Sequence, residues 1–120
     1  MLLSINPEHV ENILSGEKRF EFRKIRCKSD IDKIVIYATA PVMKVVAEVD
    51  VDEIIVDEIN AVWQQTKKYA GISYKFYREY YKGKKTAVAY KLSNVEIYAE
   101  PRHLSEFGLK CAPQSFAYIF

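Results

Sequence analysis

The sequence predicts one α+β domain in which a small mixed or antiparallel β-barrel is flanked by helices. Three observations support this fold class. The chain has 120 residues, of which 49% are apolar and 28% are charged, as in an ordinary globular domain with one core. Short stretches with a period of two follow one another at close spacing, with few long crossovers. No linker, repeat or low-complexity tract divides the chain, so we expect a single domain over residues 1–120.

The N-terminal third is predicted to hold a short helix among three strands. Asn6 followed by Pro7 is typical of the start of a helix, and Gly16 is typical of its end. The residues before and after this helix either alternate or are apolar on both faces, which indicates strands. These strands are Leu2–Ile5, Arg19–Arg23 and Lys33–Ala38.

The middle of the chain is predicted to form a strand followed by two helices. Lys44–Asp52 alternates apolar and polar residues, which indicates a half-buried strand that Ile54–Val56 continues after a bend. Helices are predicted over Asp57–Ala70 and, with Ser73 as its N-cap, over Tyr74–Tyr81. The C-terminal part is then predicted to hold two strands, a short helical turn and a last strand: Thr86–Leu92, Val95–Ala99, Leu104–Phe107 and Phe116–Phe120.

The charge balance and the cysteine count exclude several classes of protein. A net charge of +2 excludes a histone-like polycation, although clustered positive charge can still bind nucleic acid. Cys27 and Cys111 are too few for a disulfide framework or a zinc site, so free thiols are expected. No apolar stretch approaches the ~20 residues of a membrane-spanning helix. Residues 1–11 do not resemble a secretory signal, and we expect a cytoplasmic protein without membrane contact.

Basic residues concentrate directly after the predicted glycine turn. They are Lys18, Arg19, Arg23, Lys24, Arg26 and Lys28. Backbone amides of a turn next to an ammonium suit a phosphate or another anion. Glu21 lies between two arginines on one face of the predicted strand, which suits a salt-bridged pair. A solvated strand face with balanced charges explains the same pattern, so both interpretations stay open.

Two further segments carry side chains that suit a nucleic acid. Tyr77, Tyr80 and Tyr81 share one face of the second predicted helix, and the cations beside them would favour stacking of bases. Packing in the core is the more common role of such a face. Near the C-terminus, Gln114 and Ser115 are uncharged hydrogen-bonding residues at the entrance to the last strand, where a turn or cap is the alternative.

The sequence lacks the common catalytic and metal-binding patterns. His9 and His103 belong to no ligand set, and no phosphate-binding loop, dinucleotide fingerprint or nucleophile elbow occurs. Acidic residues between positions 48 and 58 lie mainly on the outer face of a predicted strand, where solubility explains them better than Mg²⁺ binding. We therefore expect neither a cofactor nor a metal ion.

Gly16, Lys18, Glu21 and Arg23 match a GxKxxExR signature, and through it the chain resembles the ASCH domain family of the PUA-like superfamily. The likeness extends over nearly the whole chain, through residues 34–41 (IVIYATAP), 44–49 (KVVAEV), 70–83 (AGISYKFYREYYKG) and 112–120 (APQSFAYIF). The chain is most similar to the compact prokaryotic and phage members, which are often described as transcriptional regulators or RNA-binding proteins.

The resemblance implies a PUA-like β-barrel with a cleft that is lined by the signature residues and binds RNA or a modified nucleobase. Some members are nucleases, and one branch hydrolyses acetylated cytidine with a lysine, a threonine and a glutamate. Lys18 matches the lysine, but Glu21 stands at the position of the threonine, and the glutamate falls near Ala70. Two of the three roles are unmatched, which disfavours that activity in this chain.

We therefore predict an RNA- or nucleotide-binding domain with a role in regulating transcription or translation. Lys18 and Arg23 are expected to contact a phosphate or a base edge, while Glu21 orients them or accepts a hydrogen bond from the base. The weaker candidates for the cleft are Arg19, Tyr37, Thr39, Gln114 and Ser115.

Two other functions stay open. A small ribonuclease would use Lys18 and Glu21 as its catalytic residues. A partner-binding domain without a ligand would use the helix Tyr74–Tyr81 as its interface. The expected oligomeric state is a monomer or a weak dimer.

Overall fold

The computed structural model describes residues 1–27, 30–114, 116–117 and 119. The elements in chain order are β1 (Leu2–Ile5), α1 (Pro7–Ser15), β2 (Phe20–Arg23), β3 (Lys33–Ala38), β4 (Lys44–Glu58), α2 (Ile59–Thr66), the 3-10 helix η1 (Lys67–Tyr69), α3 (Tyr74–Tyr80), β5 (Thr86–Arg102), the 3-10 helix η2 (Leu104–Phe107) and β6 (Phe116–Ala117). This arrangement confirms the predicted α+β class.

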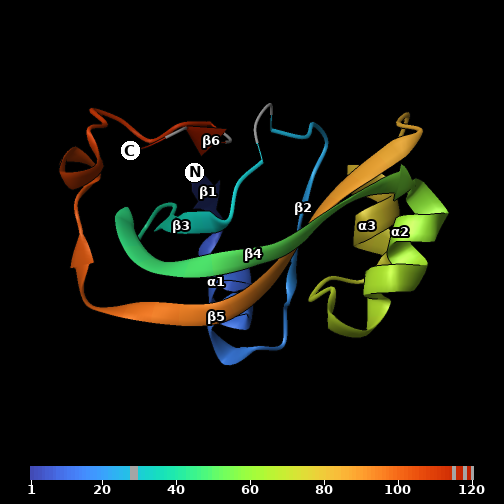
Figure 1. The fold of residues 1–120 in the computed structure, drawn as a ribbon, viewed down its shortest axis with the longest axis horizontal. Coiled ribbons are helices and arrows are strands. Elements are labelled where there is room, and N and C mark those ends of the chain that lie inside the picture. Colours follow the sequence, from blue (N-terminus) through green and yellow to red (C-terminus); the bar gives the residue numbers. More distant parts are fainter. Residues whose placement is uncertain (28–29, 115, 118, 120) are drawn as a thin grey trace.

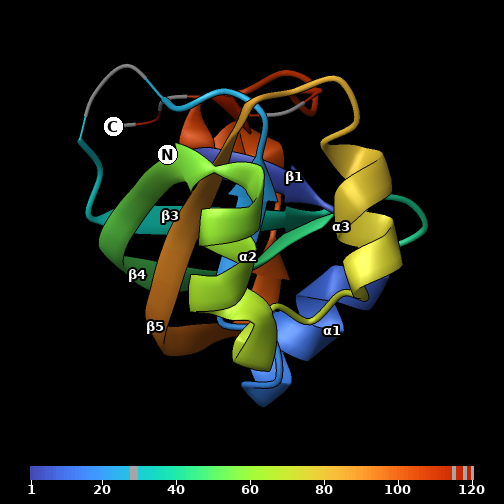
Figure 2. The ribbon, with the colours of Figure 1, turned by 90° about the vertical axis from the view of Figure 1, so that its right-hand side faces the viewer.

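The strands form one mixed sheet, ordered β2-β5-β4-β3-β1-β6, that curves into half of a barrel. β1 and β3 are parallel, and every other neighbouring pair is antiparallel. β4 and β5 form a long ribbon, with α2 and α3 at one end and η2 at the other (Figure 1). Figure 2 looks onto α2 and α3, with α1 below them.

Both long strands extend beyond their predicted ranges, and β5 joins two strands that the sequence predicts separately. β4 runs without a break over Lys44–Glu58, and β5 runs over Thr86–Arg102. Three register shifts between these strands absorb the bends that the sequence indicates. Residues 57 and 58 pair with β5, so α2 covers Ile59–Thr66 and the prediction of a helix from residue 57 is wrong.

The ends of α1 and α3 follow the predicted signals. The side chain of Asn6 accepts a hydrogen bond of 3.0 Å from the backbone N–H of Glu8, and Gly16 has a left-handed φ of +88°. At the start of α3, Oγ of Ser73 accepts a hydrogen bond of 3.1 Å from the backbone N–H of Phe76. In the part of the chain that the structure describes, no helix is long and apolar enough to cross a membrane.

The aromatic face of α3 belongs mainly to the core. Tyr77 and Tyr81 are buried against β2, α2 and β5, so the common packing role holds for both. Tyr74 and Phe76, on other sides of the same helix, are exposed. A second buried cluster lies around α1 and the centre of the sheet, and a third lies near η2. Among the described residues, Cys27 and Cys111 form no disulfide bond, as predicted.

Candidate functional site

The centre of the candidate site is Lys18, whose side chain is buried although it carries an ammonium. The residue is 2% exposed and lies between the end of α1 and the start of β2. Its Nζ donates a hydrogen bond of 2.7 Å to the carbonyl oxygen of Ala70 and lies 4.0 Å from Oε1 of Glu21. Burial lowers the pKa of Lys18, and the nearby Glu21 carboxylate offsets that shift only in part.

The Lys18 ammonium has fewer partners than its three N–H groups can use. Among the described residues it makes one hydrogen bond, to Ala70, while its Nζ lies 4.9 Å from the ring centroid of Phe22. The Glu21 oxygen at 4.0 Å is beyond hydrogen-bond distance. A buried cation with unfilled donors opposes folding, and such groups concentrate where a ligand binds.

Gly71 makes room for the Lys18 side chain. Its φ is +70°, and a Cβ built there would lie 2.5 Å from Cβ and 2.6 Å from Cγ of Lys18. A side chain at this position would therefore collide with the lysine stem. The loop between η1 and α3 supplies both the carbonyl of Ala70 that holds the ammonium and the gap that the stem occupies.

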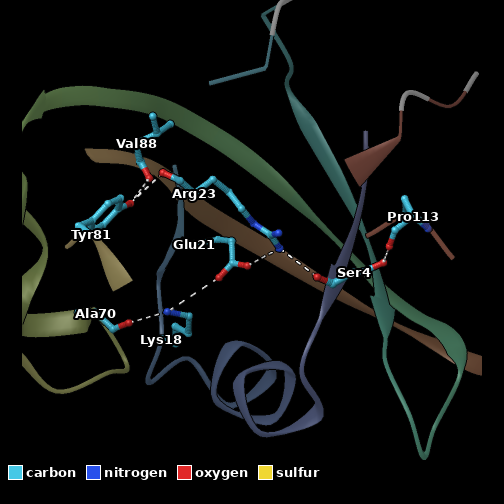
Figure 3. Close-up of polar contacts among 8 residues, drawn as sticks. All are labelled: Ser4, Lys18, Glu21, Arg23, Ala70, Tyr81, Val88 and Pro113. Carbon is cyan, nitrogen blue, oxygen red and sulfur yellow. Dashed lines mark hydrogen bonds and ion pairs between the residues drawn. The ribbon is translucent and has the colours of Figure 1, made fainter. Parts of the chain in front are cut away.

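β2 carries the two other charged residues of the site, Glu21 and Arg23. Their side chains leave the same face of the strand, and Nη2 of Arg23 donates a hydrogen bond of 2.9 Å to Oε2 of Glu21. The same Nη2 donates to the carbonyl oxygen of Ser4 at 3.0 Å, and the Ser4 hydroxyl donates to the carbonyl oxygen of Pro113 at 2.6 Å. Figure 3 shows these contacts leading from Lys18 through β2 to β1.

These charged residues do not form a solvated strand face, so that interpretation is wrong for them. The side chains of Glu21 and Arg23 are 9% and 15% exposed. Charges in such a partly dry site interact more strongly than charges on the surface. The hydroxyl of Tyr81 lies 2.9 Å from the carbonyl oxygen of Arg23 and 3.1 Å from that of Val88, which ties β2 and β5 to the end of α3.

A pocket of about 150 Å³ opens beside these charges, between α1, β2 and α3. Lys18, Glu21 and Arg23 all line it. The N-terminal end of α1 contributes Asn6 and His9. The larger apolar groups that line it are Ile5, Phe22, Ile72, Phe76 and Tyr80. The pocket therefore combines hydrogen-bond donors and one carboxylate with aromatic rings, a combination that suits a planar polar ligand such as a nucleobase.

Most of the weaker candidates lie away from this pocket. Arg19 precedes β2 and does not line this pocket; its guanidinium lies 3.9 Å from the ring centroid of Tyr69. Tyr37 is buried in the cluster near η2, because β3 is a central strand with packing on both faces. Thr39 and Gln114 do not line the pocket either. Ser115 lies outside the described residues. A ligand-binding role for these residues stays a prediction.

Several lining residues had no signal in the sequence. His9 belongs to no ligand set in the sequence, but it lines the pocket, and its Nδ1 is buried with no hydrogen-bond partner among the described residues. Ser4 joins the site because β1 lies opposite β2 across the half-barrel, which no local pattern reveals. Phe76 and Tyr80 could have been suggested from the sequence, because basic residues flank the aromatic residues of α3.

The chain is similar to known proteins in sequence and in fold. The family model of the ASCH domain matches residues 3–97. A protein of Zymomonas mobilis named ASCH domain-containing ribonuclease is 34% identical over 92 residues, which cover 76% of this chain and 62% of that protein. The crystal structure of ASCH from Zymomonas mobilis superposes with a TM-score of 0.89 at 28% identity, over 99% of this chain and 86% of that chain.

A much longer protein also matches almost the whole chain. ATP synthase subunit alpha of Ureaplasma parvum serovar 3 is 32% identical over 120 residues, which cover 99% of this chain. The chain spans only 15% of the length of that protein, so the likeness concerns one segment of it.

Proposed function

The chain belongs to the ASCH domain family, and on that premise we propose that it binds RNA or a nucleotide-like ligand in the pocket between α1, β2 and α3. The observation that carries this proposal is the burial of the Lys18 ammonium. Its buried ammonium has one hydrogen bond among the described residues and lines a pocket with aromatic walls. A ligand oxygen would fill the remaining donors and offset the cost of burying the charge.

One unpaired base would enter the pocket while its backbone stays outside. Phe76 lines the pocket and is 50% exposed, so a base can stack on its ring, and such stacking contributes about 1–3 kcal/mol per base. The polar edge of the base would meet Lys18, Glu21 and Arg23. The phosphates would lie near Lys24, whose Nζ is 4.9 Å from the ring centroid of Tyr80.

A titration of labelled single-stranded RNA tests this function. Lys18→Met keeps an unbranched side chain but removes the ammonium, so we expect an affinity loss of about tenfold or more, ~1.4 kcal/mol. Lys67→Met, which replaces an exposed lysine of η1, is the matched control and should bind like the wild type. Equal affinities of the wild type and Lys18→Met would contradict the proposal.

The salt dependence of the same affinity tests the phosphate contacts. Each neutralised phosphate of a single strand contributes about −0.7 to the slope of log affinity against log salt. With two or three contacts we expect a slope of about −1.4 to −2.1. A slope of zero would contradict the proposed phosphate contacts and leave only the recognition of the base in the proposal.

RNA cleavage by the same site is a second candidate function. It is favoured by the name of the Zymomonas mobilis relative, a ribonuclease, and by the lowered pKa of Lys18. Glu21 would act as the base, and the Lys18 ammonium would stabilise charge that develops on the attacked phosphate. Cleavage that is lost in Lys18→Met but kept in Tyr74→Phe, which alters an exposed tyrosine of α3, would support this function. Stoichiometric binding that leaves the RNA intact would support the first.

A protein that binds RNA without cleaving it can act as a regulator. We propose a regulator of transcription or translation that acts in the cytoplasm as a monomer or a weak dimer. A protein partner would contact the exposed part of α3 around Tyr74. Sedimentation of the protein with and without RNA tests the oligomeric state.

A further inference from the structure

His9 lines the pocket from the side of α1 and contacts α3. Its ring meets the ring of Phe76 edge-on, with the two centroids 5.9 Å apart and the two planes inclined at 64°. Such an edge contact stabilises two aromatic rings, including rings without any nitrogen. The packing against Phe76 therefore explains why a ring stands here but not why the ring is an imidazole.

The two ring nitrogens of His9 have different surroundings. Nδ1 is enclosed by the protein and has no hydrogen-bond partner among the described residues. Nε2 has no hydrogen-bond partner in the described part of the chain either, but it is not enclosed, since the ring is only partly buried. Nε2 is therefore the nitrogen that a ligand in the pocket can reach.

The burial of Nδ1 also indicates where the neutral ring carries its proton. A neutral imidazole has one N–H and one nitrogen lone pair. Buried N–H groups without an acceptor are rarer in proteins than buried acceptors without a donor. The proton of the neutral ring should therefore lie on Nε2, so that His9 presents a hydrogen-bond donor at the accessible nitrogen.

A side chain that only filled this space would do better without the nitrogens. A phenyl ring could make the same edge contact with Phe76 and would leave no buried nitrogen unpaired. Unpaired buried polar atoms are uncommon in folded proteins, so each of them needs an explanation. Here the explanation lies in the other nitrogen, because an imidazole that brings the Nε2–H to the pocket has to bury Nδ1.

We propose that His9 binds the nucleotide by donating a hydrogen bond from its Nε2–H to a ligand oxygen. The ring stands beside Phe76, on which the base stacks in the proposed function, so the accepting oxygen lies at the rim of that base. Two oxygens fit this description, the 2′-hydroxyl of the ribose and a carbonyl oxygen of the base. This contact rests on the RNA-binding function proposed above and adds a recognition residue from α1 to it.

Two variants separate the donor of His9 from its ring. His9→Phe keeps an aromatic ring and removes both nitrogens, so RNA affinity should fall by about three- to tenfold, the range for one neutral hydrogen bond. His9→Gln places an amide N–H as many bonds from Cβ as Nε2 is, so it should bind RNA more tightly than His9→Phe does. His103→Phe, at the other histidine of the chain and outside the pocket, is the control and should bind like the wild type.

Thermal melts show whether each variant is folded. His9→Phe should melt at the wild-type temperature or above it, because the variant removes a buried nitrogen that has no partner among the described residues.

A pair of probes identifies the accepting oxygen. A labelled uridine pentamer and the matching deoxyuridine pentamer differ only in their 2′-hydroxyl groups. If the ribose is the partner, His9→Phe weakens the binding of the uridine pentamer and leaves the binding of the deoxyuridine pentamer unchanged. Equal losses for the two probes assign the hydrogen bond to the base.

The ¹⁵N signals of the histidine rings test the donor without any change at His9. At a mildly alkaline pH, at which imidazoles are neutral, the His9 ring should carry its proton on Nε2, and added RNA should shift the Nε2 signal. The spectrum of His103→Phe shows which signals belong to His9.

The outcomes separate this inference from the proposed function. Equal RNA affinities of His9→Phe and the wild type, equal losses in His9→Phe and His9→Gln, or a proton on Nδ1 of the neutral ring each overturn the contact. All three results leave RNA binding through Lys18 in place. Failure of the wild type to bind either probe or a longer RNA overturns the proposed function and the contact of His9 with it.

Discussion

Replacing Gly71 by alanine should displace Lys18 and empty the site of its central cation. The added Cβ would lie 2.5 Å from Cβ, 2.6 Å from Cγ and 2.9 Å from Cδ of Lys18, and real atoms do not approach so closely. The stem of Lys18 is enclosed by the protein, because the residue is 2% exposed. Either the lysine or the loop that carries Ala70 must move, and the hydrogen bond between them is lost.

Two costs add up in this variant. A left-handed φ costs an alanine about 1–2 kcal/mol. Overpacking of a filled interior costs about 1–3 kcal/mol more. Gly83→Ala is the matched control, since Gly83 has a φ of +81° but nothing within 4 Å of its added Cβ. The control should therefore show only the backbone cost.

Urea denaturation, thermal melts and RNA titration of the two variants separate the effects. Gly71→Ala should be about 1–3 kcal/mol less stable than Gly83→Ala. For a domain of this size that difference lowers the melting temperature by roughly 4 °C per kcal/mol. RNA affinity should fall about tenfold or more in Gly71→Ala and stay at the wild-type value in Gly83→Ala. If the two variants have the same stability and the same RNA affinity, the packing of Lys18 against Gly71 is not what positions the ammonium.

Three further predictions concern pH, the support of β2 and the reaction. Burial lowers the pKa of Lys18, so the unfolded chain holds that proton more tightly than the folded protein does. The unfolding free energy of the wild type should therefore rise relative to that of Lys18→Met as pH increases from neutral toward 10.5. Urea melts that show the same difference between the two proteins at every pH in this range would contradict the prediction. Tyr81→Phe removes the hydroxyl between the carbonyls of Arg23 and Val88 and should cost about 1 kcal/mol at neutral pH. Burial raises the pKa of Tyr81, so the folded state holds its proton more tightly, and stability should fall above pH 10.0 more steeply in the wild type than in Tyr81→Phe. Acetylcytidine should not be hydrolysed, since Glu21 offers no hydroxyl nucleophile, and turnover measured by chromatography that Lys18→Met abolishes would refute this.

The local signals of the sequence predict both ends of α1, the start of α3 and the central strand well. Asn6, Ser73 and Gly16 act through contacts within a few residues, so their roles depend little on the rest of the fold. The sequence predicts β5 as two strands and a bend within β4, because these irregularities lie at register shifts that only the pairing between the two strands can absorb. Tertiary pairing therefore decides what the local pattern leaves open.

In the candidate site, too, the sequence predicts what depends on neighbouring residues but not what depends on tertiary contacts. The signature residues Lys18, Glu21 and Arg23 line one pocket, as the motif predicts for residues close in sequence. Their burial could not be predicted, because the cover comes from α3 and from the loop that follows η1. The sequence also does not decide which way Tyr37 faces, since a tyrosine on a central strand can face either side of the sheet; this one faces the core near η2.

The most direct test of the account is whether Lys18 itself responds to RNA. Lysines labelled with ¹⁵N at Nζ and ¹³C at Cε can be followed one by one by NMR, with Lys18→Met identifying the signal of Lys18. We expect the Lys18 signal to move progressively and to saturate as a uridine pentamer is added, while the signal of the exposed Lys67 stays in place. A Lys18 signal that does not move at RNA concentrations that saturate binding would contradict the account.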